Sequence, residues 1–461
     1  MTHLFIEASK YFMIFLILMY TYECFHVFKF SDDKEKKQNR IYSFQRKLIF
    51  LIHFDAYCVL FLQYRNKQII GFYLIQFILF LSISLIYRLF YKKASNLVLN
   101  NMLFLLTIGM VELTRLSFDK AFKQFLFIVA GFVIAIIIPL ILNHVSIFRN
   151  FTYLYASIGI IALALVRIIG KKSYGAYLTI KFGGIAIQPS EFVKIIFVFF
   201  IASMLYKKND FRQLMKTSII SAIFVLILVA SKDLGGALLY FFTYLVMVYV
   251  ATRRFYIFAG GISIMAMAAF LGFKFFSHVQ TRVLAWKNPI SVIDNEGYQV
   301  CQSLFAIGTG GWFGLGLGQG LPKKIPVVEN DFIFAAISEE MGGIFALCII
   351  MICVSCFLMI FNISMQMKDQ FYKLVALGLG SIYALQVFLT IGGVIKFIPS
   401  TGVTLPLISY GGSSLLSTMI IFGIIQALYI MQSASLNERK MKNNKGEAVA
   451  NERKAERKEN K

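Results

Sequence analysis

Residues 125–142 read FLFIVAGFVIAIIIPLIL and carry no charged side chain over eighteen positions. An α-helix needs about 20 predominantly apolar residues to cross the hydrocarbon core of a bilayer. The chain contains about thirteen apolar runs that meet this requirement. They lie near residues 8–28, 46–64, 69–91, 95–113, 121–143, 150–170, 189–206, 216–231, 234–251, 254–275, 332–361, 371–395 and 407–432. The sequence therefore predicts an all-α, polytopic integral membrane protein.

The composition of the whole chain agrees with this prediction. Apolar residues make up 58% of its 461 residues, charged residues make up 15%, and the mean hydropathy is +0.72. Soluble domains have about 45–50% apolar and about 25% charged residues. A soluble enzyme, a disordered protein and a disulfide scaffold are therefore excluded.

Positive charge predicts the orientation of the spans. The chain has 46 Lys and Arg against 23 Asp and Glu, and every second short loop is basic, as in the first loop at residues 29–47. Basic loops face the cytoplasm. We therefore expect the N-terminus outside and the C-terminus in the cytoplasm, which requires an odd number of spans.

Two of the predicted outer loops are long, at residues 167–188 and 274–331, and long loops in compact domains are often functional. The second contains an apolar piece, residues 300–307, which we expect to lie in the interface or to re-enter the membrane. The basic tail, residues 436–461, is expected to be solvated or to contact lipid headgroups. Nucleic-acid binding is the weaker alternative, because no aromatic residues alternate with its charges.

Polar motifs stand where spans meet the predicted outer face. Glu191 and Lys194 follow Gln188-Pro189-Ser190 and share one face of the predicted helix. A structural ion pair and a functional site are equally good interpretations of them. Asp233 precedes another span, where an N-cap is favoured over a functional role.

Two further motifs belong to the long second loop. The glycine-rich run at 308–320 lacks the Gly-Lys-Ser/Thr of a phosphate-binding loop, so close approach of backbone to a ligand or a helix is the better interpretation. Asp331 directly precedes a span, and its alternatives are an N-cap and a catalytic carboxylate. Glu339 and Glu340 fall about two turns further on, where carboxylates need partners, a cavity or a proton.

The last motif, residues 399–414, combines two prolines, several hydroxyl groups and a glycine pair before the final span, which favours a hydroxyl-lined cavity. The five histidines are scattered, so carboxylates are the best candidates for acid–base chemistry. Because all these motifs converge on one face, the sequence predicts a carboxylate-bearing site that opens outward.

At these residues the chain resembles the SEDS family (shape, elongation, division and sporulation), which includes RodA, FtsW and SpoVE. The matching motifs are QPSE with its following lysine (188–194), DLG (233–235), GYQ…QS…AIG (297–308), GLGQG (316–320), DFIFA…EE (331–340) and TG…LP…SYGGSS (401–414). The resemblance covers residues 95–435, whose ten spans match the ten-span family core. Residues 1–94 hold three additional spans, and their role is left open.

The resemblance implies a peptidoglycan glycosyltransferase of the bacterial cytoplasmic membrane that polymerises lipid II on its outer face. Asp331 matches the essential family aspartate and is the expected general base of an inverting transfer. The expected substrate-binding residues are Glu191, Lys194, Lys232, Asp233, Arg282, Gln299, Gln302, Ser409 and Ser413. Lys194, Lys232 and Arg282 are candidates for stabilising the leaving pyrophosphate, and a divalent cation such as Mg²⁺ or Mn²⁺ is another. A class B penicillin-binding protein, a transpeptidase, is the expected partner.

The chain departs from the family pattern at four positions, which are Thr179, Lys232, Gly236 and Thr390. These departures suggest a divergent branch of the family. Residues 390–402 favour RodA-like members. The resemblance leaves elongation, division and sporulation open as the process that the protein serves. Two alternative functions also remain. A lipid II flippase would need a polar path through the whole bilayer, and a non-catalytic scaffold for a transpeptidase would predict a neutral residue at position 331.

Overall fold

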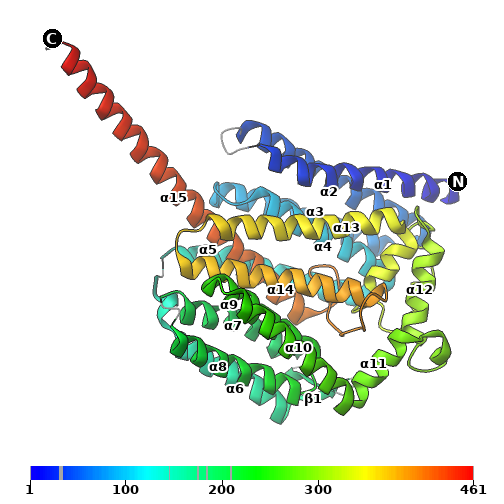
Figure 1. The fold of residues 1–461 in the computed structure, drawn as a ribbon. Helices are drawn as coiled ribbons and strands as arrows, with labels where there is room; N and C mark the ends of the chain where they lie inside the picture. The colour runs from blue at the N-terminus through cyan, green and yellow to red at the C-terminus, as the bar shows by residue number, and fades with distance from the viewer. Residues whose placement is uncertain are drawn as a thin grey trace.

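The computed structural model describes residues 2–30, 35–144, 146–173, 176–182, 185–207 and 210–459. Within them, twelve helices are long and apolar enough to cross a membrane. They are α1 (Thr2–His26), α2 (Glu35–Tyr64), α3 (Lys67–Phe90), α4 (Asn96–Leu116), α5 (Phe118–His144), α6 (Thr152–Ile169), α8 (Phe211–Ala230), α9 (Leu234–Thr252), α10 (Phe255–Phe275), α13 (Ile333–Gln366), α14 (Gln370–Val394) and α15 (Gly412–Glu459). They lie roughly alongside one another in a bundle (Figure 1).

One predicted span, near residues 189–206, is the shorter helix α7 (Pro189–Leu205). Its 17 residues stand at the lower end of the about 17–25 that a spanning helix needs. With it the helices correspond to the thirteen predicted runs, while the number of true spans and their orientation stay predictions. α15 extends beyond the last predicted run to Glu459, so residues expected as a tail continue the helix.

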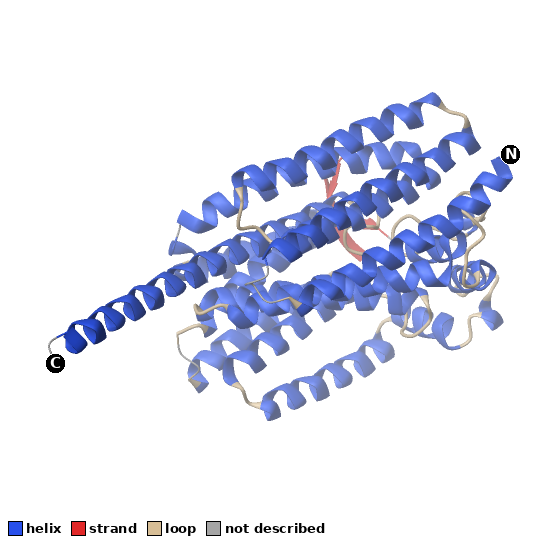
Figure 2. Ribbon diagram, turned by 90° about the horizontal axis from the view of Figure 1, so that it is seen from above, coloured by secondary structure: helices blue, strands red, loops and turns tan. Residues whose placement is uncertain are grey.

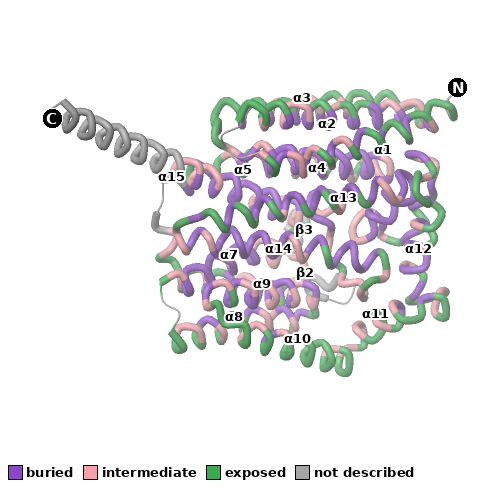
Figure 3. Tube along the Cα trace, turned by 45° about the horizontal axis from the view of Figure 1, so that its top comes forward, coloured by how far each residue is buried: buried purple, intermediate pink, exposed green. Residues whose placement is uncertain are grey.

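Burial separates central from peripheral helices. The whole membrane-spanning part of α4 is buried, whereas α10 is exposed along nearly all its length (Figure 3). α1 and α2 pack together, α2 also packs on α4, and α1 packs on α13. α3 packs on α2 and α5, so all three N-terminal helices are part of the packed bundle.

A three-stranded antiparallel sheet was not expected from the sequence. It consists of β1 (Lys171–Ser173), β2 (Ala176–Phe182) and β3 (Ile185–Ile187), in the order β1-β2-β3. It occupies the predicted long loop between α6 and α7 and lies among the helices (Figure 2). β1 and β3 have three residues each and are too short to show a period. β2 does alternate, with Leu178, Ile180 and Phe182 apolar and Thr179 and Lys181 polar, which is a strand signal that the loop interpretation overlooked.

The second long loop is also ordered into short helices. These are α11 (Ser277–Lys287), η4 (Ile290–Val292), α12 (Tyr298–Gly310) and η5 (Pro322–Lys324), joined to α13 by residues 325–332. The apolar piece at residues 300–307 lies within α12, which packs against α13. The loop is therefore a folded unit that rests on the bundle.

A sharp kink in α13 brings the backbone of two segments together. Gly342 lies inside α13 with φ of 89°, a conformation that favours glycine. On either side of the kink, Gly316 N–H donates to the Glu340 carbonyl at 2.8 Å and Gly343 N–H donates to the Gly311 carbonyl at 2.8 Å. A side chain at Gly342 would collide with the backbone of Gly314. Close backbone approach is therefore the role of the glycine-rich run.

We predict that Gly342→Ala destabilises the protein by at least about 2 kcal/mol, because alanine adds backbone strain and a collision. Gly260→Ala in α10 is the matched control, since its new methyl group meets open space in a helix. Thermal unfolding in detergent should show a lower Tm for Gly342→Ala and an unchanged or slightly higher Tm for Gly260→Ala. Equal Tm values for the two variants would contradict the assignment.

Candidate functional site

A cavity of about 670 Å³ opens between α5, α7, α9, the small sheet and the segment before α15. Its volume falls within the range of roughly 300–1,000 Å³ that is usual for ligand sites. Its wall is mixed, with apolar side chains and a group of polar ones. The latter include Lys123, Gln188, Ser190, Glu191, Lys194, Asp233, Asn330, Tyr410, Ser413 and Ser414.

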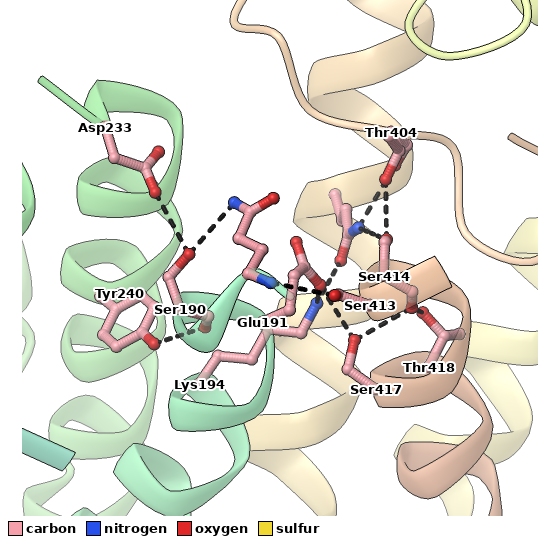
Figure 4. A network of polar contacts seen from close by, with 12 residues as sticks. Ser190, Glu191, Lys194, Asp233, Tyr240, Thr404, Ser413, Ser414, Ser417 and Thr418 are labelled. Atoms are coloured by element: carbon pink, nitrogen blue, oxygen red, sulfur yellow. Dashed lines mark hydrogen bonds and ion pairs between the residues drawn. The ribbon is translucent and has the colours of Figure 1, made fainter. Parts of the chain in front are cut away.

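The Glu191–Lys194 pair lies at the wall of this cavity. Pro189 starts α7, and three residues of helix then bring the Lys194 Nζ within 2.6 Å of the Glu191 carboxylate. The Ser417 hydroxyl donates to the same carboxylate at 2.9 Å, and Lys194 donates to Gln386 at 3.1 Å. Figure 4 shows these side chains from α7 meeting those of α15. The pair is thus a real ion pair that also lines the cavity.

Asp233 closes the neighbouring side of the cavity. One of its carboxylate oxygens accepts the Gly236 N–H at 2.9 Å, so the expected N-cap of α9 is formed. The other accepts from Ser190 at 3.3 Å, which ties α9 to α7 (Figure 4). Burial raises the pKa of Asp233, opposed by these hydrogen bonds. Capping α9 does not withdraw the Asp233 side chain from the cavity, because Asp233 is also one of the residues that line it.

Asp331 is not an N-cap. Phe332 occupies the N-cap position of α13 and makes no side-chain capping bond. The half-buried Asp331 carboxylate instead lies beside Gly402, which has φ of 74° and also adjoins the Arg282 guanidinium. Burial raises the pKa of Asp331, and the positive charge of Arg282 acts in the opposite direction.

Several contacts fix the segment that carries Asp331. The Tyr410 N–H donates to the Glu329 carbonyl at 2.8 Å, and the Ser409 hydroxyl donates to the Asn330 carbonyl. Lys120 of α5 forms an ion pair with the Glu329 side chain. The predicted site residue Ser409 therefore contacts the Asp331 segment, and Asn330 extends from that segment into the cavity wall.

The structure brings together only part of the predicted set. Glu191, Lys194, Asp233 and Ser413 line the cavity, and Arg282 lies beside Asp331 and donates to the Ser400 carbonyl at 3.2 Å. The remaining three lie elsewhere among the described residues. Lys232 is exposed, Gln299 donates to the Pro326 carbonyl at 2.8 Å, and Gln302 is half-buried on α12.

Sequence reasoning missed several residues at the site, among them Gln386 and Lys123. Gln386 of α14 contacts Lys194 and donates to the Thr404 carbonyl at 3.2 Å. Lys123 of α5 adds a cation to the cavity wall. Each is a polar residue inside an apolar run, which is the signal that could have identified it, because such residues turn toward a cavity or a partner.

A divalent cation would find few protein ligands here. Among the described residues, no group of three or more His, Cys, Asp or Glu side chains is arranged to hold a metal ion. Divalent cations in phosphate chemistry often take one or two carboxylates and complete their shell with substrate phosphates and water. Asp233 or Asp331 would fit that limited role.

Comparison with known proteins identifies the family. Residues 87–434 match the cell cycle protein family FtsW/RodA/SpoVE. The peptidoglycan glycosyltransferase RodA of Mycobacterium tuberculosis is 33% identical over 380 residues, which cover 75% of this chain and 80% of that protein.

Solved structures share the fold. A chain of a peptidoglycan synthase complex that coordinates polymerization and crosslinking has a TM-score of 0.64 at 20% identity, over 74% of this chain and 98% of its own. RodA of Thermus thermophilus has a TM-score of 0.56 at 20% identity, over 73% of this chain and 96% of its own. The apolar helices and these matches make the chain a multi-pass protein of the bacterial cytoplasmic membrane. It belongs to the FtsW/RodA/SpoVE family.

Proposed function

We propose that this protein is a peptidoglycan glycosyltransferase that polymerises lipid II into glycan strands on the outer face of the membrane. The observation that carries the proposal is the Asp331 carboxylate, which lies with the Arg282 guanidinium around Gly402, a residue in the wall of a polar cavity of suitable size. The glycosyltransferase name of the M. tuberculosis relative supports the same reaction class. Asp331 differs from the other acidic side chains of the site, which are hydrogen-bonded to Lys194, Ser417, Ser190 or Gly236.

In the proposed reaction, Asp331 accepts the proton of the acceptor 4-hydroxyl on N-acetylglucosamine. The freed oxygen attacks the anomeric carbon of the terminal muramyl sugar of the growing strand, and the bond to undecaprenyl pyrophosphate breaks. An α-linked donor thereby gives a β-linked product in one inverting displacement. One positioned carboxylate is enough for this chemistry, and general base catalysis contributes typically 10²–10⁴-fold.

The leaving pyrophosphate needs positive charge nearby. The charge of Lys194 is already compensated by Glu191, so its main proposed role is to hold the cavity wall. Arg282 lies close to Asp331 and to the cavity residue Gly402, so it serves both the base and the leaving group. Lys123, an exposed side chain on the cavity wall, is the additional candidate that the structure supplies.

We also propose a transpeptidase partner of the class B penicillin-binding type. The support is the structural neighbour, which comes from a complex that coordinates polymerization and crosslinking. The glycan strand produced by polymerisation is the substrate that crosslinking requires, so the two activities need to act in one place.

Replacing the base tests the proposal directly. We predict that Asp331→Asn lowers the rate of glycan polymerisation from labelled lipid II by at least about 100-fold, because an amide cannot take the proton. The measurement uses the purified full chain with its cognate transpeptidase. Asp294→Asn is the matched control, because Asp294 is an exposed aspartate of the same loop. This variant should polymerise lipid II at the wild-type rate.

The same experiment separates the alternatives. Polymer formation by Asp331→Asn at the wild-type rate would rule out Asp331 as the base. A wild-type protein that forms no polymer but moves lipid II across liposomes would instead be a transporter. A wild-type protein that does neither, yet activates its partner, would be a scaffold.

The Arg282–Asp331 arrangement predicts a pH effect. The base must be ionised, so the polymerisation rate falls as the pH drops through the pKa of Asp331. The positive charge of Arg282 lowers this pKa. Arg282→Met should therefore raise the pKa of Asp331 and move the acid limb of the pH–rate profile to higher pH.

Two further variants control for this measurement. Arg282→Lys keeps the charge and should keep most of the acid limb in place. Lys287→Met removes an exposed cation from the same helix and should leave the limb unchanged. An acid limb that stays in place or moves to lower pH in Arg282→Met would show that Arg282 does not tune the base.

A further inference from the structure

The three N-terminal helices precede most of the family match, which begins at residue 87. Two of them, α1 and α2, nevertheless contact the segment 311–321, called here the glycine segment, which joins α12 to η5. The principal contact is made by Gln63 near the end of α2, whose side-chain amide donates to the Gly318 carbonyl at 2.6 Å. Gly318 has φ of 79°, and a side chain there would occupy the position of the Gln63 amide. The fit between these residues requires glycine.

The first helix contacts the same segment at two other points. Ile6 of α1 approaches Gly316 so closely that a methyl group added there would lie 2.9 Å from it. The ring of Tyr11 lies 5.8 Å from that of Phe313, centroid to centroid. α1 therefore covers the stretch that Gln63 holds by hydrogen bonding.

The other side of the glycine segment is attached to α13. The Gly318 N–H donates to the Glu340 carboxylate at 2.7 Å, and the Leu321 N–H donates to Glu339 at 3.0 Å. Arg115 of α4 contacts both Glu340, at 2.9 Å, and the Gly320 carbonyl, at 3.0 Å. The peptide groups around Gly318 are thus bonded on one side to the N-terminal helices and on the other to the family core.

This attachment reaches Asp331 through two short paths. Asp331 lies ten residues after Leu321 in the chain, and α13 begins two residues after Asp331. The Asp331 segment follows the glycine segment in the chain and leads directly into α13, to which the glycine segment is hydrogen-bonded. A movement of the glycine segment would therefore also displace the Asp331 carboxylate. General base catalysis is sensitive to such movement, because it requires hydrogen-bond reach of about 2.6–3.2 Å.

We propose that the N-terminal helices are a positioning element for Asp331, acting through the Gln63–Gly318 hydrogen bond. This inference rests on the proposed function, because it assigns Gln63 to the placement of the base. Gln63 itself touches neither the cavity nor Asp331. It is therefore a positioning residue, and its removal should affect the chemical step more than substrate binding.

The test compares Gln63→Met with Gln68→Met in the full chain with its transpeptidase. Methionine keeps the length of the Gln63 side chain and its helix propensity but removes the donor. Gln68 is an exposed glutamine five residues further on. We expect Gln63→Met to lower kcat about two- to tenfold, as loss of one hydrogen bond allows, with an unchanged KM for lipid II. Hydrogen exchange of the amides at 316–321 and 327–331 should rise in the same variant, and Gln68→Met should change neither.

The proposal requires both effects. Wild-type values of kcat in Gln63→Met, or a reduced kcat with unchanged exchange in the two segments, would overturn it. Loss of folded protein would also lower the apparent kcat at an unchanged KM, so kcat is calculated per folded molecule, and a wild-type Tm of Gln63→Met excludes unfolding as the cause. If the wild type forms no glycan polymer at all, the proposed function fails, whereas the exchange measurement still reports whether Gln63 holds the glycine segment.

Discussion

The buried carboxylate of Glu340 is the group around which the segments near the site are arranged. It is fully enclosed in a helix of an apolar bundle, where an unpaired charge would be costly. Arg115 pairs with it, and the N–H groups of Gly318 and Gly320 donate to it. These partners come from α4 and from the glycine segment, so one charge fixes three parts of the chain. Glycine is needed in the loop because its peptide groups must lie directly against α13.

The position of Asp331 follows from this arrangement. After Asp331 the chain enters α13, to which the glycine segment is bonded, and before it Ser409 and Tyr410 donate to the carbonyls of Asn330 and Glu329, the two preceding residues. The Asp331 carboxylate lies near the Arg282 guanidinium, and the preceding residue, Asn330, is part of the cavity wall. The acidic groups across the cavity, Glu191 and Asp233, are engaged in hydrogen bonds that hold the cavity wall, which supports the proposal that Asp331 is the carboxylate that reacts.

Local sequence patterns predicted the parts of this structure that depend on near neighbours. Apolar runs located the helices, the spacing of Glu191 and Lys194 placed both on one face of α7, and the position of Asp233 indicated a cap. The motif resemblance supplied Asp331 and its expected role. Ser413 lies in the cavity wall, whereas Lys232 and Gln302 lie away from that wall in the described structure, and substrate binding by each of them stays a prediction.

Contacts between distant residues could not be read from local patterns. Arg282 meets Asp331 only through the folding of the long loop, and Gln63 meets Gly318 across 255 residues of chain. β1 and β3 were hidden by their shortness, because three residues show no period, and Asp331 was open to interpretation as an N-cap until Phe332 was found in that position. In each case tertiary packing, which local propensity does not encode, decided the outcome.

The central claim is that Asp331 is the base that meets the acceptor sugar. A cryo-electron microscopy structure of the protein with lipid II bound at the acceptor position would measure this contact directly. The account predicts a carboxylate oxygen of Asp331 within about 3.2 Å of the N-acetylglucosamine 4-hydroxyl. An acceptor hydroxyl bonded to Asp233 or Glu191, with Asp331 directed away from the sugar, would contradict it.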